Sequence, residues 1–137
     1  MLLVRTKIGF SGIHGIGLFA DQFIPKGTIT WKYDPEFDIS FTEEQVEKLS
    51  DIAKERFFHY SYFDKDLNKY VLCWDDLRFI NHSDDPNIDS TPRQDMAKRD
   101  IHLGEELLCN YDHYEEGYFE RRNLDPREFS KKRMPPK

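Results

Sequence analysis

Short runs of apolar and β-branched residues, each ended by glycine, proline or aspartate, limit the folds that this 137-residue chain can adopt. Strands favour such residues and turn residues end them. A chain of this length can bury one hydrophobic core, and we see neither internal repeats nor a second domain. The pattern does not give the strand order. We expect strands over residues 2–10, 17–24, 28–33, 60–63, 70–74, 94–99 and 107–111.

One longer segment has a helical pattern. Thr42 and Gln45 stand at the spacing of a capping box, so we expect a helix over residues 42–56. A shorter amphipathic stretch, residues 114–122, also suits a helix. Many short strands with one main helix indicate an α+β fold, mainly β. The apolar residues predicted to share one face of the main helix are Val46, Leu49, Ile52 and Ala53.

Acidic residues outnumber basic ones, which gives a net charge of −6. Residues 34–66 hold ten acids and four bases, whereas residues 127–137 hold one acid and five bases. An acidic body suits a basic protein partner and argues against direct nucleic-acid binding, although a merely solvated surface is the alternative. No apolar run approaches the roughly 18–20 residues that a membrane span needs. We therefore expect no membrane partner.

The chain contains two cysteines, Cys73 and Cys109, each inside an apolar run. We expect free buried thiols, with a disulfide between them as the alternative. None of the five histidines stands at zinc-ligand spacing from a cysteine, so we predict no structural metal. The N-terminal residues lack the long apolar region of a signal peptide. We expect a cytoplasmic or nuclear location, with delivery into a host cell as an alternative.

Three motifs hold residue types that bind ligands. Gly15-Ile16-Gly17 places two glycines where a backbone can approach a ligand closely. Residues 78–87 read RFINHSDDPN, and residues 104–111 read GEELLCNY. Taken alone, the three motifs could be a hairpin turn, a capped turn, and a turn followed by a core strand. The glycine pair is no dinucleotide-binding fingerprint, because no third glycine opens a helix.

The order and content of these motifs resemble the SET-domain family of protein lysine methyltransferases. Residues 78–87 match the family pattern R-F-I-N-H-S-x-x-P-N throughout, and residues 104–111 match G-E-E-L-T-x-x-Y except that Leu108 replaces the threonine. The resemblance runs from about residue 3 to residue 114. The chain is similar to short viral and bacterial members, because it lacks the cysteines of the zinc module that follows the SET domain in many relatives.

The resemblance implies the domain organisation and the site. It implies a SET-domain (β-clip-like) fold over residues 1–120, made of several short sheets with one helical insert at about residues 40–66, and a basic tail over residues 121–137. Tyr111 stands at the catalytic position. Asn87 is implied to hold its turn. The residues implied to bind the cofactor S-adenosylmethionine are Gly15, Ile16, Gly17, Asn81 and His82.

The resemblance also implies a channel for the substrate lysine. Tyr33 stands near a channel position, although Asp34-Pro35 replaces the small residues usual there and a plain strand tyrosine is the alternative. Cys109 fills a place often held by a larger aromatic that limits methylation in some relatives. We hypothesise that Cys109 leaves room for higher methylation. An aromatic residue from 114–119 could stack on adenine or form a channel wall, with core packing as the alternative.

The implied activity is methyl transfer from S-adenosylmethionine to the side-chain amine of lysine in a protein, with a histone tail as one candidate substrate. Burial of the lysine and the nearby sulfonium charge would favour the neutral amine, so no strong protein base is required, and the sequence offers no obvious one. The implied partner is a basic, lysine-containing protein or peptide, bound extended along a sheet edge. A homodimer could complete the channel. The alternatives are a catalytically silent SET-like module that binds basic peptides, and a β-rich structural domain.

Overall fold

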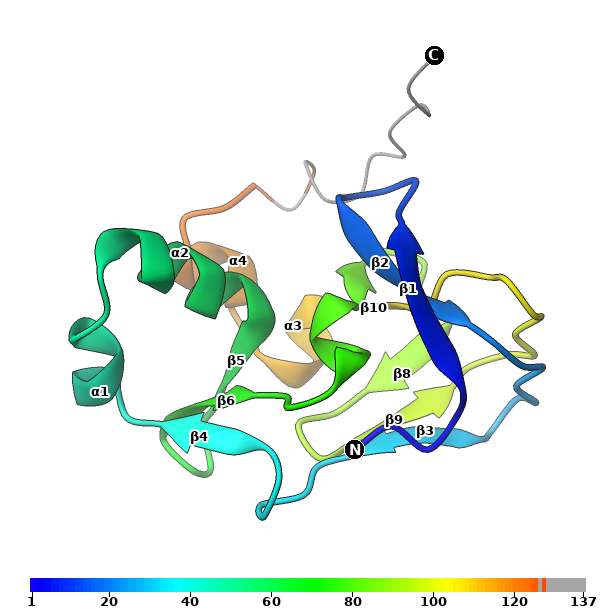
Figure 1. Ribbon diagram of the computed structural model, residues 1–137, viewed down its shortest axis with the longest axis horizontal. Helices are drawn as coiled ribbons and strands as arrows, with labels where there is room; N and C mark the ends of the chain where they lie inside the picture. Colours follow the sequence, from blue (N-terminus) through cyan, green and yellow to red (C-terminus); the bar gives the residue numbers. More distant parts are fainter. Residues whose placement is uncertain (126, 128–137) are drawn as a thin grey trace.

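The computed structural model describes residues 1–125 and 127, which form four small sheets and several short helices (Figure 1). This arrangement confirms the predicted α+β, mainly β class. The strands are β1 (Thr6–Phe10), β2 (Ile16–Ala20), β3 (Ile29–Lys32), β4 (Ile39–Phe41), β5 (Ser61–Asp64), β6 (Lys69–Leu72), β7 (Asn81–His82), β8 (Ile88–Ser90), β9 (Gln94–Ala97) and β10 (Leu108–Cys109). The helices are α1 (Glu43–Glu47), α2 (Asp51–Tyr60), the 3₁₀ helix η1 (Asp76–Phe79), α3 (Tyr111–Tyr114) and α4 (Tyr118–Arg121).

An antiparallel hairpin of β1 and β2 carries the glycine motif. Gly9 lies opposite Gly17, and Gly15 turns the chain with a φ of +50° that L side chains rarely adopt. Leu18 and Ala20 on β2 are fully buried in the main core. Burial of these two side chains fixes the hairpin against the rest of the protein.

A three-stranded antiparallel sheet has the order β3-β9-β8. The predicted strands at 28–33 and 94–99 are confirmed, but β8 lies in a stretch where we predicted no strand. Ile88 and Ser90 are buried and Asp89 is exposed, so β8 does alternate as a half-buried strand. Its three residues are too few for the alternation to be visible in the sequence.

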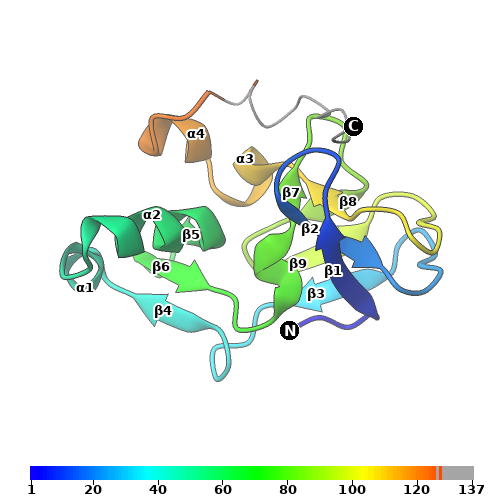
Figure 2. The same ribbon diagram turned by 45° about the horizontal axis from the view of Figure 1, so that its top comes forward.

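The parallel pair of β7 and β10 brings distant motifs together (Figure 2). Asn81 lies opposite Leu108, and His82 lies opposite Cys109. The amide of Asn87 holds the pair, since its Nδ2 donates to the Glu106 carbonyl at 2.9 Å and its Oδ1 accepts from the Leu108 N–H at 2.8 Å. Asn87 thus holds the turn as predicted, and Tyr111 starts a helix immediately after the pair.

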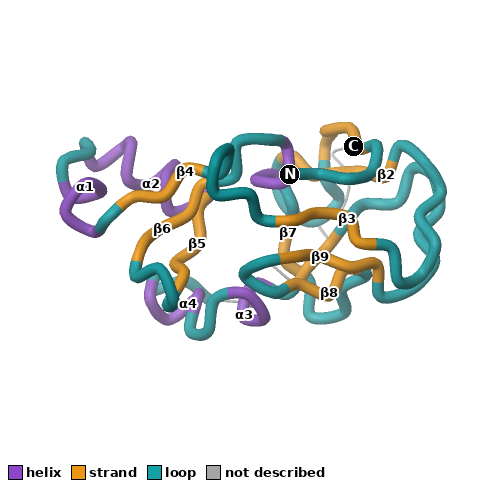
Figure 3. Tube along the Cα trace, turned by 90° about the horizontal axis from the view of Figure 1, so that it is seen from below, coloured by secondary structure: helices purple, strands orange, loops and turns teal. Residues whose placement is uncertain are grey.

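The insert forms a lobe of its own, made of β4, α1, α2, β5 and β6 (left in Figure 1). Figure 3 shows the same separation from below. Val46, Phe63 and Tyr70 form a second buried apolar cluster there. The capping box of Thr42 is confirmed. The single helix over 42–56 is wrong, because Ser50 starts a new helix by accepting a hydrogen bond from the Ala53 N–H at 3.2 Å.

The break between α1 and α2 also overturns the predicted apolar face. Val46 is buried as expected, but the side chain of Ile52 is 76% exposed. A helix that restarts at Ser50 turns Ile52 outward, and Phe57 and Phe58 pack against the cluster instead. Phe57 and Phe58 therefore contact the apolar cluster, where we expected Ile52 to do so.

The segment after Tyr111 packs on the insert lobe and contains two short helices. Only α4 lies within the stretch 114–122 that was predicted to be helical, whereas α3 begins at Tyr111, where we expected the end of a strand. Glu115 and Arg122 form a buried ion pair, with Nη1 and Oε2 2.5 Å apart. The Glu115 carboxylate also accepts from the Phe63 N–H at 2.5 Å, and Arg122 Nε donates to the Phe58 carbonyl at 3.0 Å. These contacts tie the two lobes together. Most of the predicted basic tail lies outside the described residues.

Two further predictions concern the whole chain. Cys73 and Cys109 are both free and buried, as expected. No helix in the described part is long and apolar enough to cross a membrane.

Candidate active site

Tyr111 lies at the centre of the candidate site and is almost fully buried. Its hydroxyl donates to the Ile80 carbonyl at 2.6 Å, and its backbone N–H donates to Nδ1 of His82 at 3.1 Å. Burial raises the pKa of the Tyr111 phenol well above its usual value. The phenol is therefore neutral at physiological pH and acts as a hydrogen-bond donor.

His82 fixes the position of Tyr111. Because Nδ1 accepts the Tyr111 N–H, we assign the ring proton to Nε2, which lies 3.0 Å from Oδ1 of Asp84. Burial lowers the pKa of His82, although Asp84 opposes that effect, and the ring is neutral near pH 7. Its centroid lies 5.2 Å from that of Tyr111 and 4.8 Å from that of Phe119. His82 thus holds both the backbone and the ring of Tyr111.

Asn81 joins the hairpin to the second motif. Its Nδ2 lies 2.9 Å from the His14 carbonyl, 3.1 Å from the Ile16 carbonyl and 3.0 Å from Oε2 of Glu106. Glu106 also accepts from the Ser11 hydroxyl, at 2.8 Å for each carboxylate oxygen. From the sequence, Glu106 had no role beyond its place in the motif of residues 104–111. In the structure this carboxylate fastens the hairpin loop to Asn81.

Gly17 leaves the space that Glu106 occupies. A Cβ atom at Gly17 would lie 2.4 Å from Oε2 of Glu106, which is closer than real Cβ contacts. The glycine is needed here for clearance, since no positive φ is recorded at this position. Gly17 therefore supports the site through Glu106.

Two cavities lie on either side of Tyr111. The first, which we call the narrow cavity, has a volume of about 40 Å³, room for roughly three water molecules. Its lining includes side chains from both lobes, among them Trp31, Tyr62, Asp95, Cys109 and Tyr114. The second, the wide cavity, has a volume of about 220 Å³, and its lining includes Gly15, Ile16, Arg56, Arg78 and Asn81.

The two cavities share part of their walls. The residues that line both are His59, Tyr60, Arg78, Ile80 and Tyr111. Tyr111 is therefore part of the wall of both spaces, a wide one beside the glycine loop and a narrow one lined by residues of the β3-β9-β8 sheet. Such an arrangement can hold one ligand on each side and bring their reactive ends together at the phenol.

The structure brings most of the predicted site residues to these cavities. Gly15, Ile16 and Asn81 line the wide cavity, Cys109 lines the narrow one, and Tyr111 lines both. Tyr114, one of the aromatic residues considered for a channel wall, also lines the narrow cavity.

Three of the predicted residues lie elsewhere. Gly17 and His82 are outside both linings and support Glu106 and Tyr111 instead. Tyr33 also lies outside both linings, with its ring centroid 5.1 Å from the guanidinium carbon of Arg93. A channel role for Tyr33 and cofactor binding by His82 stay predictions.

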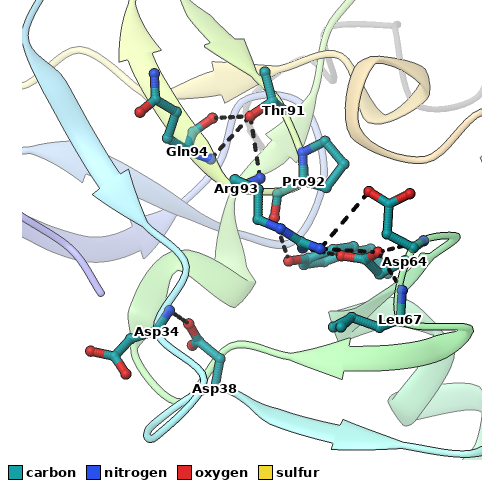
Figure 4. Close-up of polar contacts among 10 residues, drawn as sticks. Asp34, Asp38, Asp64, Leu67, Thr91, Pro92, Arg93 and Gln94 are labelled. Carbon is teal, nitrogen blue, oxygen red and sulfur yellow. Dashed lines mark hydrogen bonds and ion pairs between the residues drawn. The ribbon is translucent and has the colours of Figure 1, made fainter.

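A polar cluster beside the narrow cavity holds its outer wall in place (Figure 4). Arg93 forms an ion pair with the buried carboxylate of Asp64, and Figure 4 shows the arginine reaching across to that residue. The Tyr62 hydroxyl donates to the Pro92 carbonyl at 2.9 Å. These bonds join β5 of the insert to the turn before β9. They fix Tyr62 and Thr91, which both line the cavity.

Sequence reasoning missed a buried acid in the narrow cavity. Asp95 is 4% exposed, and burial raises the pKa of its carboxyl from 3.8 to about 7. Among the described residues, the buried side-chain atoms without hydrogen-bond partners are Trp31 Nε1, Ser61 Oγ and Ser90 Oγ, and the first two residues line the same cavity. The signal that could have found Asp95 is the period of two along β9, which places Asp95 and Ala97 on the buried face.

The wide cavity carries positive charge. Its lining includes Arg56 and Arg78 together with His14 and His59. Burial, reinforced by nearby His14, lowers the pKa of His59, so the two arginines are the permanent cations. Nowhere in the described part of the chain do three or more His, Cys, Asp or Glu side chains gather in a way that could hold a metal ion.

Comparison with known proteins identifies the family. The model of the SET domain matches residues 15–112, which is more than half of the chain and includes all three motifs. The chain belongs to the SET-domain family. The match starts at the glycine loop and ends just after Tyr111, so it includes every residue that lines the two cavities except His14 and Tyr114.

Individual relatives share this SET domain at low identity. A Plasmodium falciparum protein named "Putative histone-lysine N-methyltransferase 1" is 29% identical over an alignment of 122 positions that covers 79% of this chain and 2% of that protein. The Chaetomium thermophilum polycomb repressive complex 2, autoinhibited and bound to S-adenosylmethionine, has a TM-score of 0.64 at 21% identity, covering 88% of this chain and 16% of the other. A Plasmodium falciparum "putative histone methyltransferase" has a TM-score of 0.59 at 23% identity, covering 82% and 96% of the two chains. These structural likenesses concern the fold.

Proposed function

We propose that this SET domain transfers methyl groups from S-adenosylmethionine to the side-chain amine of lysine in a protein substrate. The observation that carries the proposal is the meeting of the wide and narrow cavities at Tyr111. The sequence resemblance and the named relatives support this reaction class. A histone tail is one candidate substrate.

The wide cavity suits S-adenosylmethionine. That molecule carries a carboxylate, and Arg56 and Arg78 supply cations that can attract it. The backbone of Gly15 and Ile16 and the amide of Asn81 lie in the same lining and offer polar groups to its amino-acid end. When bound, the cofactor supplies a methyl group on a positively charged sulfur. We propose that these residues hold it with the methyl group toward Tyr111.

The narrow cavity suits the end of a lysine side chain. Its walls are mostly apolar or aromatic, and apolar walls disfavour an ammonium ion and lower its pKa. The Tyr111 phenol can orient the entering amine. The Ile80 carbonyl, which accepts the hydrogen bond of that phenol, lines the same cavity. Alignment of the two ligands would supply most of the rate acceleration. The neutral phenol is suited to orientation, not to removal of a proton.

The insert lobe offers a surface for a basic protein substrate. Glu43, Glu44 and Glu47 are exposed on α1. Replacing these three residues by glutamine should weaken the binding of a lysine-rich synthetic peptide and flatten its salt dependence. Unchanged affinity in calorimetry would remove α1 from substrate binding. We also propose that the small side chain of Cys109 permits more than one methylation, and that a homodimer is a further state to test.

The experiment is methyl transfer to a basic protein mixture, followed with labelled S-adenosylmethionine for the wild type and for Tyr111→Phe. We expect at least a 100-fold loss of turnover in the variant, on the scale that one catalytic group contributes. The affinity for S-adenosylmethionine in calorimetry should change less than threefold, because the hydroxyl of Tyr111 is engaged with Ile80.

The same experiment separates the alternatives. A wild-type protein that binds basic peptides and transfers no label would be a silent SET-like module. Equal loss of turnover and cofactor affinity in Tyr111→Phe would mean that the phenol supports binding and not the reaction. Absence of any S-adenosylmethionine binding would remove the proposed enzyme altogether.

A further inference from the structure

One acidic side chain in the narrow cavity has no role in the account so far. The carboxyl of Asp95 is buried on β9, directly opposite Trp31 in the pairing of β9 with β3. Among the described residues, the polar side chain recorded against it is that of Ser90 on the neighbouring strand. Ionising a buried carboxyl without a cationic partner costs free energy. Buried groups with strongly shifted pKa values cluster at functional sites.

The surroundings of Asp95 leave room for one added cation. The N-terminal ammonium lowers the pKa of Asp95 only slightly against the effect of burial. His59 and Arg78 line the end of the cavity that is shared with the wide one. The remaining ionisable side chains in the lining are thiols and phenols, none of them a cation: Tyr60, Tyr62, Cys73, Cys109, Tyr111 and Tyr114.

Two orphaned polar atoms lie in the same lining. Nε1 of Trp31 can donate a hydrogen bond, and Oγ of Ser61 can donate or accept one. Buried atoms of this kind are normally satisfied by a ligand or by water. Together with the carboxyl of Asp95 they make a polar patch inside otherwise aromatic walls. The patch fits the nitrogen of a primary amine and the water around it.

We propose that Asp95 receives the proton of the substrate lysine inside the narrow cavity. The inference rests on the proposed function, and it names the base that the sequence did not offer. The entering ammonium pairs with the Asp95 carboxylate. One N–H bond of the ammonium then breaks and an O–H bond forms on the carboxyl, which leaves a neutral amine with a free lone pair. Asp95 returns the proton to solvent after the product has left.

The energetics permit this transfer in the cavity. A free lysine has a pKa of about 10.4, well above that of Asp95, so the proton would stay on lysine in water. Burial of the amine and a neighbouring sulfonium both lower the pKa of lysine. Burial raises the pKa of Asp95 to about 7, so the two groups approach each other in proton affinity. The transfer also replaces two buried charges by two neutral groups.

The test compares the wild type with Asp95→Asn, and with Asp89→Asn as the matched control. Asp89 lies on the adjacent strand β8 with its side chain exposed, so the control removes the same charge from the same sheet. The pH dependence of kcat/KM is measured on a lysine-containing peptide that the wild type methylates. Calorimetry of peptide binding at pH 8, in two buffers of different ionisation enthalpy, counts the protons released.

We expect wild-type kcat/KM to level off above about pH 7, when Asp95 is ionised. In Asp95→Asn, kcat/KM should keep rising tenfold per pH unit toward the pKa of free lysine near 10.4. Calorimetry should show almost no proton release for the wild type and for Asp89→Asn, and close to one proton per bound peptide for Asp95→Asn. The proton count does not depend on turnover.

Two outcomes would overturn the inference in different ways. If the wild type is active and Asp95→Asn has the same pH profile and proton count, Asp95 is not the base, and the proposed function stands. If the wild type transfers no methyl group to any lysine peptide or protein, the proposed function fails and the role of Asp95 fails with it.

Discussion

Replacing Asp95 by asparagine should remove a pH dependence from the folding stability of this protein. The carboxyl has an ordinary pKa of 3.8 and a pKa of about 7 in the folded protein, raised by burial. Below about pH 4 it is protonated in both states, and above about pH 7 it is ionised in both. Between these limits only the folded chain holds the proton. The stability that this proton contributes is therefore present at low pH and is lost as the pH rises to about 7.

The size of the effect follows from the two pKa values. A tenfold change in proton affinity corresponds to ~1.4 kcal/mol, so a rise from 3.8 to about 7 corresponds to roughly 4 kcal/mol lost between pH 4 and pH 8. This is a large part of the ~5–15 kcal/mol that stabilises a typical domain. Asparagine does not titrate, so Asp95→Asn should lack this loss.

The assay is urea unfolding of the wild type, Asp95→Asn and Asp89→Asn at pH 4, 5.5 and 8. His59 and His82, whose pKa values burial lowers, titrate in the same range in all three proteins and cancel in the differences. The difference between Asp95→Asn and the wild type should grow by about 4 kcal/mol from pH 4 to pH 8, and the control should run parallel to the wild type. If the unfolding free energy of Asp95→Asn changes with pH in parallel with that of the wild type, the Asp95 carboxyl is not buried without a cationic partner.

Two further substitutions test the supports of the site. Gly17→Ala places a Cβ 2.4 Å from the Glu106 carboxylate, so we expect the free energy of unfolding in urea to fall by ~1–3 kcal/mol and S-adenosylmethionine to bind more weakly. If neither quantity changes, Glu106 can move freely. Glu115→Gln leaves Arg122 buried without its counter-ion and should lower the free energy of unfolding by ~3–5 kcal/mol. The control Glu116→Gln removes an exposed partner of Lys65 and should lower it by less than ~1 kcal/mol; equal effects would contradict the buried pair.

The sequence predicted those features that local chemistry determines. Strands with several alternating residues, such as residues 28–33 and 94–99, were found because their apolar pattern is long enough to read. The capping box at Thr42 was found because its two side chains act within one turn. Tyr111 was placed by resemblance and not by physics, and its hydrogen bond to Ile80 joins residues 31 positions apart.

The features that the sequence did not predict depend on distant contacts. The parallel pair of β7 and β10 has two residues on each strand, so neither strand leaves a periodic pattern. The apolar pattern of the insert is continuous across Ser50, but the Ser50 side chain caps a new helix there, so the chain forms two helices instead of one. Asp95 was missed because an acid in a strand is normally read as solvent-facing, although the period of two along β9 places it on the buried face, opposite Trp31.

The central claim is that two ligands meet at Tyr111, one from each cavity. A crystal structure with S-adenosylhomocysteine and a lysine peptide tests it directly. We predict the nucleoside product beside Gly15 and Asn81, and the lysine amine in the narrow cavity within hydrogen-bonding distance of the Tyr111 phenol or the Asp95 carboxyl. A product bound elsewhere, or a lysine that approaches from outside the narrow cavity, would contradict the account.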